Sequence, residues 1–212
     1  MNEIERKLEE LFDKGEFKKI DLRFVKEGVD VLQQINLVQQ KYNKNDTDTF
    51  INELRDSIVG NVLGYGLVNI RKHGFDCKKE NKKIYLEVKD ASFSSDSWQA
   101  TFNDTTLEKA KAFQDPRLYL ALAVWKGASD LLFICYGQNK KIGEFLEQKV
   151  NAFKNEGKNV RSTQSITLSK LVFTYGFKIF PVSKSKEEIK QLLLLANKSF
   201  NKLTDDMFGI LN

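Results

Sequence analysis

Two acidic residues and one lysine near the middle of the chain have the types and spacing needed for metal-assisted hydrolysis. Ten residues separate Asp76 from the triplet Glu87-Val88-Lys89. Two carboxylates held close together can share a hard divalent cation such as Mg²⁺. A lysine beside them can orient or deprotonate an attacking water, and it can offset negative charge that develops on a phosphate. These three residues therefore predict hydrolysis of a phosphate ester.

Other catalytic chemistries lack their residues. The chain has one histidine, His73, which excludes any site built from two histidines of one chain. No G-x-S-x-G elbow supplies a serine nucleophile, and no G-x-x-x-x-G-K-[S/T] loop is present. The two cysteines, Cys77 and Cys135, cannot form a four-thiolate zinc site or a disulfide framework. Carboxylate, lysine and metal chemistry remains.

The elements around the triplet decide whether its spacing has meaning. An acid-x-lysine pattern occurs eight times in this lysine-rich chain, but only Glu87 and Lys89 fall within a clear apolar strand, Ile84–Lys89. Side chains alternate along a strand, so Glu87 and Lys89 should share one face while their apolar neighbours face a core. A polar turn centred near Asn81 predicts a hairpin that places Asp76 across from Leu86 and next to Glu87.

The rest of the chain reads as one α/β domain with a central mixed sheet flanked by helices. Residues 1–65 are mostly helical in pattern, residues 66–136 hold the hairpin, a helix and two central strands, and residues 137–212 hold helices and a strand. Apolar periodicity and caps predict these elements: helices at Glu3–Phe12, Val25–Tyr42, Asp48–Val62, Thr105–Gln114, Lys141–Phe153 and Lys184–Phe200; strands at Leu118–Trp125, Leu131–Tyr136 and Leu171–Val182; polar loops at Ser92–Asn103 and Glu156–Ser165.

Composition and charge fit this assignment. The chain has 212 residues, 41% of them apolar, which is enough for one sizeable core. A net charge of +5 favours a polyanionic partner. No apolar run approaches the roughly 20 residues of a membrane span, and no secretory signal is visible, so we expect a cytoplasmic protein without a membrane partner.

The hairpin residues resemble a known family, the PD-(D/E)xK nuclease superfamily, and within it the type II restriction endonucleases. The resemblance covers roughly residues 50 to 136 and is carried by Gly74-Phe75-Asp76 followed by Glu87-Val88-Lys89, with Phe75 standing where the family usually has proline. It implies a restriction-endonuclease-like fold, with Asp76 and Glu87 as metal ligands and Lys89 as the catalytic lysine. Members often add a helical glutamate near the metal, for which Glu53 is the first candidate and Asp56 the second.

The resemblance also implies the function. We expect a Mg²⁺-dependent, sequence-specific endonuclease that cleaves double-stranded DNA to leave 5′-phosphates, with a cognate DNA methyltransferase acting on the same site. Two strands require two cuts, so a homodimer is the economical expectation.

Two polar segments have the hydroxyl, amide and basic groups that contact DNA. Small hydroxyls and amides suit base edges, and a lysine suits phosphate. The candidates are Ser92, Ser94, Ser95, Ser97 and Gln99 in the first segment, Lys109 on the helix that follows, and Arg161, Ser162 and Gln164 in the second segment.

Two other interpretations remain open. One is a repair or junction-resolving nuclease of the same fold. The other is a non-catalytic DNA-binding or inhibitor protein whose acidic pair is structural. Apart from these, Asp76, Glu87 and Lys89 could simply form a cross-strand salt bridge on a solvated strand face, worth under about 1 kcal/mol.

Overall fold

The chain divides into two compact units, Met1–Phe50 and Ile51–Asn212. The computed structural model describes residues 50–67, 75–79, 82–127, 129–157 and 162–211, together with eight helical positions between residues 30 and 41. Those eight positions agree with the helix predicted over Val25–Tyr42, whereas the helix predicted over Glu3–Phe12 lies outside the described residues. The second unit contains the sheet and the residues predicted to do chemistry. The assignment of residues 1–212 to a single nuclease domain stays a prediction.

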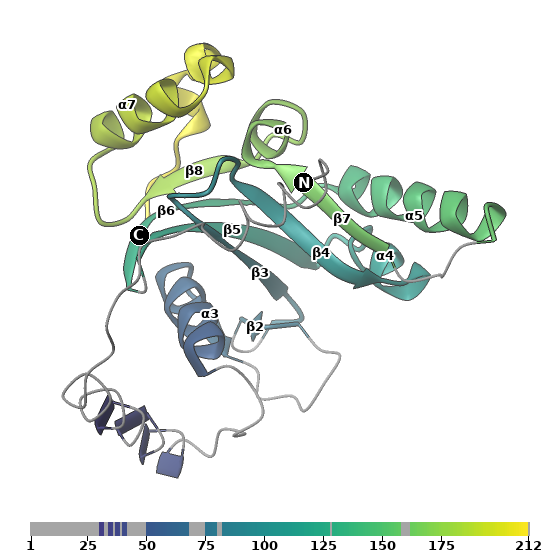
Figure 1. Ribbon diagram of the computed structural model, residues 1–212, viewed down its shortest axis with the longest axis horizontal. Coiled ribbons are helices and arrows are strands. Elements are labelled where there is room, and N and C mark those ends of the chain that lie inside the picture. Colours follow the sequence, from purple (N-terminus) through teal and green to yellow (C-terminus); the bar gives the residue numbers. More distant parts are fainter. Residues whose placement is uncertain are drawn as a thin grey trace, which may run out of the picture. The chain divides into compact units, whose positions relative to one another are not determined.

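The core of the second unit is a mixed β-sheet flanked by helices, as predicted (Figure 1). Only β3 and β5 run parallel, and the other neighbouring strands are antiparallel. Among the described residues the sheet has six strands in the order β1-β2-β3-β5-β6-β8: β1 Gly66–Leu67, β2 Cys77–Lys78, β3 Tyr85–Ser92, β5 Leu118–Lys126, β6 Asp130–Gly137 and β8 Lys178–Pro181.

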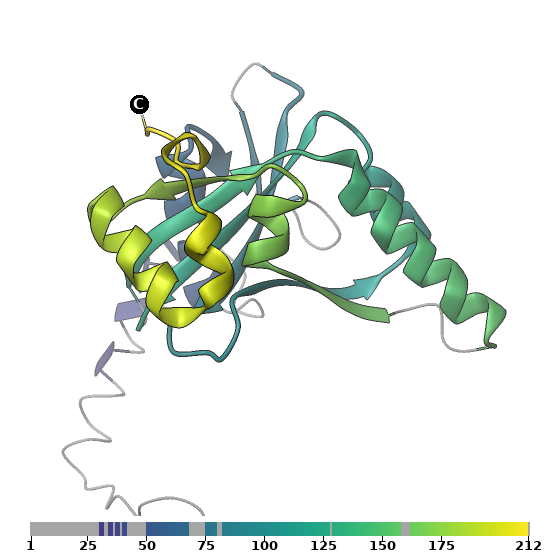
Figure 2. The same cartoon turned by 90° about the horizontal axis from the view of Figure 1, so that it is seen from above.

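Strand β5 is apolar on both faces because each face meets a different core. Ala121, Ala123 and Trp125 pack with the helix α3, Phe50–Val62, while Leu120 and Leu122 pack on the opposite side. On that opposite side lie four helices (Figures 1 and 2): α4 Leu107–Ala112, α5 Lys140–Asn155, α6 Leu168–Phe173 and α7 Lys186–Ala196, followed by two 3-10 helices, Lys198–Lys202 and Asp205–Met207. None of the helices in the described ranges is long and apolar enough to cross a membrane.

The hairpin is present with a register that differs by one residue from the prediction. Cys77 pairs with Leu86, so continuing the register by one residue places Asp76 opposite Glu87 rather than opposite Leu86. The turn closes through the backbone N–H of Lys79, which donates to the carbonyl of Ile84 at 3.0 Å. The pairing is therefore centred half a residue farther along the chain than predicted.

Two segments predicted as separate loops pair with each other. Strand β4, Gln99–Thr105, and strand β7, Ser162–Thr167, form a two-stranded antiparallel sheet, which we call the β4–β7 ribbon (Figure 1). Its alternation explains why it forms: Ala100, Phe102 and Ile166 are buried in the core on one face, and polar side chains line the other. The helix predicted from Thr105 instead begins after Thr106, whose hydroxyl caps it by accepting from the backbone N–H of Lys109.

The strand predicted over Leu171–Val182 is also wrong in its first half. Residues Leu168–Phe173 form α6, because Thr167 caps a helix in which Leu168, Leu171 and Val172 are all buried. Gly176, with φ of +71°, lies between this helix and β8.

Gly60 sets how closely α3 can approach β2. A Cβ atom at this position would lie 2.6 Å from the Sγ atom of Cys77. Cys77 is fully buried, and its thiol donates a hydrogen bond to the backbone carbonyl of Asp56 at 3.5 Å. Glycine is unfavourable inside a helix, so the contact with β2 explains its presence here.

We predict that Gly60→Ala destabilises the protein by about 1–3 kcal/mol, the usual cost of overpacking a core. Helix propensity alone predicts the opposite sign, a gain of up to about 1 kcal/mol. Urea unfolding measures the difference, with Asn61→Ala, an exposed neighbour on the same helix, as the control. A Gly60→Ala variant as stable as the wild type would show that α3 is not held at this distance.

Candidate active site

The predicted triplet lies on β3, but its face of the strand is buried. Glu87 is only 4% exposed, and the neighbouring residues Leu86 and Val88 are buried against the α3 side. Both faces of β3 are therefore covered at Glu87, so Glu87 does not lie on a solvated strand face. A buried carboxylate requires a counter-charge, because removing an isolated charge from water is costly.

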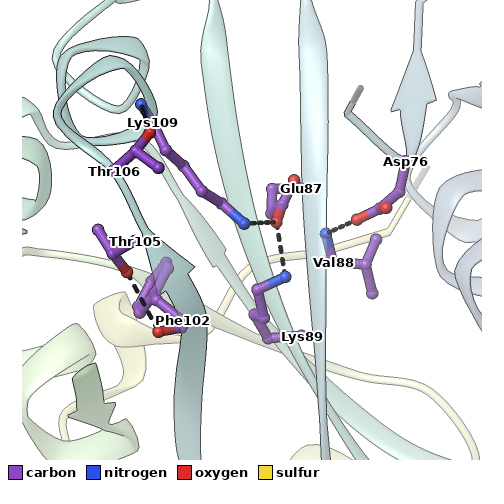
Figure 3. A network of polar contacts seen from close by, with 8 residues as sticks. All are labelled: Asp76, Glu87, Val88, Lys89, Phe102, Thr105, Thr106 and Lys109. Carbon is purple, nitrogen blue, oxygen red and sulfur yellow. Dashed lines mark hydrogen bonds and ion pairs between the residues drawn. The ribbon is translucent and has the colours of Figure 1, made fainter. Parts of the chain in front are cut away.

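Two lysines supply that counter-charge. The Nζ atom of Lys89 lies 2.6 Å from Oε1 of Glu87, and the Nζ atom of Lys109 lies 3.4 Å from the same oxygen. Lys89 comes from the same strand face, whereas Lys109 reaches in from α4 (Figure 3). From the sequence, Lys109 is predicted to contact DNA phosphate. The structure brings it to Glu87, through a tertiary contact for which the sequence has no local signal.

Asp76 approaches from the β2 side (Figure 3). Its Oδ2 accepts a hydrogen bond from the backbone N–H of Val88 at 2.7 Å. Because β2 comprises only Cys77–Lys78, this carboxylate takes the place of a strand partner for Val88. Burial first, and then the charge of Glu87, raise the pKa of Asp76 to about 6. The two carboxylates are thus close enough to repel each other, as the hairpin predicts.

Helix α3 adds a third carboxylate, from the second of the two positions proposed. Burial, followed by the charges of Asp76 and Asp90, raises the pKa of Asp56 to about 8. The side chain of Glu53, the first choice, lies outside the described residues. Among the described side chains of α3, Asp56 is thus the carboxylate whose charge interacts with Asp76 and Lys89.

Asp90 extends the acidic environment beyond the predicted residues. It follows the triplet on β3, and its Oδ1 accepts a hydrogen bond from Nε1 of Trp125 at 2.9 Å. Burial raises its pKa, and that hydrogen bond and Arg55 act in the opposite direction. The sequence shows that Asp90 follows Lys89 directly, but it does not predict the hydrogen bond between Asp90 and Trp125 of β5.

Lys89 is the shared neighbour of these carboxylates. Burial alone would lower its pKa, but the charges of Glu87, Asp76 and Asp56 outweigh burial and raise the pKa above its ordinary value. Lys89 is accordingly an ammonium ion at neutral pH in the protein alone. In this state it can donate hydrogen bonds and offset negative charge, and it cannot accept a proton.

The carboxylates fit a hard divalent cation by donor type and by electrostatics. Within the described residues, no three or more His, Cys, Asp or Glu side chains are grouped so that they could hold a metal ion. Asp76 and Glu87 together offer two carboxylates, and Mg²⁺ is usually bound by one or two carboxylates together with water and substrate phosphate. A cation would also relieve the repulsion that raises the pKa of Asp76.

The hydroxyl groups predicted to contact DNA after β3 lie in an exposed turn. Ser92 and Ser94 share a hydrogen bond of 2.9 Å between their hydroxyls, and the hydroxyl of Ser95 donates to the carbonyls of Ser92 and Ser97. Trp98 anchors the turn, because its ring is stacked on Phe93 and is buried. These hydroxyls shape the turn while remaining at the surface.

The candidates farther along lie on the β4–β7 ribbon, on different faces. Gln99 pairs with Thr167, and Thr101 pairs with Ser165, on the outer face. Gln164 pairs with Phe102, so it lies on the packed face and is half-buried. Arg161 and the side chain of Ser162 lie outside the described residues.

No known family model matches the chain, and no curated protein is significantly similar to it in sequence.

The raised pKa values predict that the protein without a cation loses stability as the pH rises. Asp56 has its pKa near 8 in the folded state and near 3.8 when unfolded, and Asp76 near 6 against 3.8. Between its unfolded and folded pKa values, each carboxyl therefore binds more protons in the native state than in the unfolded chain. The contribution of these two groups to the free energy of unfolding is fully present below pH 4, and it is lost as the pH rises through 6 for Asp76 and 8 for Asp56. Each proton contributes a slope of at most about 1.4 kcal/mol per pH unit.

Asp56→Asn should flatten this dependence above pH 6, because an amide releases no proton. Urea unfolding from pH 5 to 9 in the presence of EDTA measures it, with the exposed Asp96→Asn as the control. A wild-type protein whose stability increases from pH 6 to pH 8 would contradict the assignment of Asp56 to this cluster.

Proposed function

We propose that this protein is a Mg²⁺-dependent endonuclease that hydrolyses phosphodiester bonds of double-stranded DNA. One observation supports it above all. Lys89 interacts with Glu87, Asp76 and Asp56 in a buried cluster, in which the carboxylates raise the pKa of Lys89 and the pKa values of Asp76 and Asp56 are raised as well. Clusters with such perturbed pKa values are more common at catalytic sites than in ordinary structural ion pairs.

The residues have distinct roles in the proposed reaction. Asp76 and Glu87 would hold the cation, which supplies charge neutralisation and an activated water when bound. Lys89, as an ammonium ion, donates a hydrogen bond that orients the attacking water and offsets the charge on the phosphate. Asp56 is protonated at neutral pH in the protein alone, and it becomes available as a charged group when positive charge enters the cluster.

We also propose that the protein has a restriction-endonuclease-like fold and is a type II restriction enzyme that leaves 5′-phosphates. It would act in the cytoplasm as a homodimer, on a DNA site that a cognate methyltransferase protects. The order of α3, the β2–β3 hairpin, α4 and the central strands β5 and β6 supports it, since this order agrees with the resemblance noted in the sequence. Discrete fragments from a plasmid would distinguish such an enzyme from a junction-resolving nuclease.

The β4–β7 ribbon is the proposed base-reading element. A two-stranded ribbon fits the major groove, and hydroxyl and amide groups can bond to base edges there. Five uncharged residues with hydroxyl or amide groups line the outer face: Gln99, Thr101, Thr163, Ser165 and Thr167. The ribbon also leads into α4, from which Lys109 reaches Glu87 (Figure 3).

The function is tested by incubating plasmid DNA with the protein in Mg²⁺ and in EDTA. We predict cleavage only with Mg²⁺, and a loss of at least about 100-fold in rate for Lys89→Met or Asp76→Asn. Asp76→Asn should retain DNA binding without a cation, because it removes a charge that repels phosphate. Both variants should fold, although Lys89→Met loses stability because Glu87 then has Lys109 alone as its ammonium partner.

Lys198→Met, an exposed lysine far along the chain, is the control for general charge loss. Full activity of Lys89→Met would exclude the catalytic role. DNA binding without cleavage at any concentration of Mg²⁺ or Mn²⁺ would instead support the non-catalytic DNA-binding interpretation.

Base reading by the ribbon is tested separately. We predict that Gln99→Ala or Ser165→Ala lowers cleavage at the preferred site by about 1–3 kcal/mol of discrimination per contact, measured as relative rates on matched and one-base-changed oligonucleotides. Gln164→Ala, on the packed face, should leave the ratio of rates unchanged. The reverse result would place the packed face of the ribbon, rather than the outer face, against DNA.

A further inference from the structure

Lys109 occupies an unusual position for a surface lysine. Its helix, α4, is separated from β3 by the whole of β4, yet its Nζ lies 3.4 Å from Oε1 of Glu87 (Figure 3). The Glu87 side chain is 5% exposed and that of Lys109 is 32% exposed. The Lys109 ammonium therefore lies on the solvent side of a buried carboxylate.

The contact of Lys109 is the weaker of the two that Glu87 makes. Lys89 lies 2.6 Å from the same oxygen, a short charge-assisted bond, whereas 3.4 Å exceeds the usual 2.7–2.9 Å of such bonds. Lys109 can therefore leave while Glu87 keeps one ammonium partner. The backbone of α4 stays fixed meanwhile, because the Thr106 cap and the bond from the Phe113 N–H to the Lys109 carbonyl hold both ends of the helix.

We propose that Lys109 is an exchangeable cation of the site. In the protein alone it neutralises Glu87, and when Glu87 turns to a divalent cation, Lys109 moves to a non-bridging oxygen of the DNA phosphate. The inference rests on the proposed nuclease function and deepens it, because it identifies a phosphate-binding residue that competes with the metal. Lysine suits this role as a compact point charge on a flexible stem.

Exchange predicts opposite effects on the two ligands. Removing the Lys109 charge takes away a competitor for Glu87, so a divalent cation binds more tightly. The same change removes a phosphate contact, so DNA binds less tightly. A lysine that only ties α4 to β3 would change Ca²⁺ affinity without lowering DNA affinity in Ca²⁺ below that of the Lys111→Met control, and a lysine that only binds phosphate would change DNA affinity alone.

The test uses Lys109→Met, which keeps the stem and removes the charge, with Lys111→Met on the same helix as the matched control. Calorimetric titration with Ca²⁺, without DNA, should give binding about threefold to tenfold tighter for Lys109→Met than for the wild type. DNA binding in Ca²⁺ should weaken, and its salt slope should fall by about one. Lys109→Arg should restore the DNA affinity.

Unchanged Ca²⁺ affinity in Lys109→Met, with normal Ca²⁺ binding by the wild type, would overturn this proposal alone. A wild type that binds neither Ca²⁺ nor DNA would overturn the proposed function together with it. Lys109→Gln allows the same comparison if the methionine variant is poorly folded, and urea unfolding of each variant separates loss of structure from loss of a ligand.

Discussion

The burial of the Glu87 carboxylate is the constraint on which the rest of the site depends. A charged group this deep between two packed layers must be compensated. The structure compensates it twice, with Lys89 from the same strand and Lys109 from α4. Because Lys109 must lie near Glu87, the helix α4 has to pack close to β3, and the strand β4 that precedes α4 has to lead it there.

The remaining carboxylates of the cluster, Asp76 and Asp56, are costly to keep charged. Asp76 and Asp56 both have raised pKa values, to about 6 and about 8, with burial as the largest cause and neighbouring negative charge next. Buried charged groups often stabilise a fold less than well-packed hydrophobic residues would. Three acidic groups beside two lysines therefore agree with the proposed cation and phosphate.

Much of the site could be predicted from sequence because it is built on local geometry. The alternation of Ile84–Lys89 and the polar turn before it are enough to predict the hairpin and the proximity of Asp76 to Glu87. The register was wrong by one residue because it depends on the turn, which closes between Lys79 and Ile84. The strands β5 and β6 were clear because apolar runs with both faces buried have few alternatives.

The missed features are those that depend on tertiary contacts or on ambiguous residue types. Serine and threonine suit both loops and exposed strands, so the β4–β7 ribbon could be recognised only from Ala100 and Phe102, which alternate with polar neighbours. The helix α6 reads as a strand because its run of Leu, Val and Phe is short, and only the Thr167 cap argues for a helix. The contact of Lys109 with Glu87 follows from how α4 packs, which no local pattern encodes.

The residues of the cluster all come from one stretch of the chain, Asp56 to Lys109, whereas the sheet that supports them is completed by β8 near the C-terminus. The entropy lost in closing a loop grows with its length, so bringing these side chains together costs less than adding β8 to the opposite edge of the sheet. The proposed site thus belongs to the part of the fold with the lower contact order, and the more distant segments contribute chiefly the second core, which fixes β5 and β6 in place.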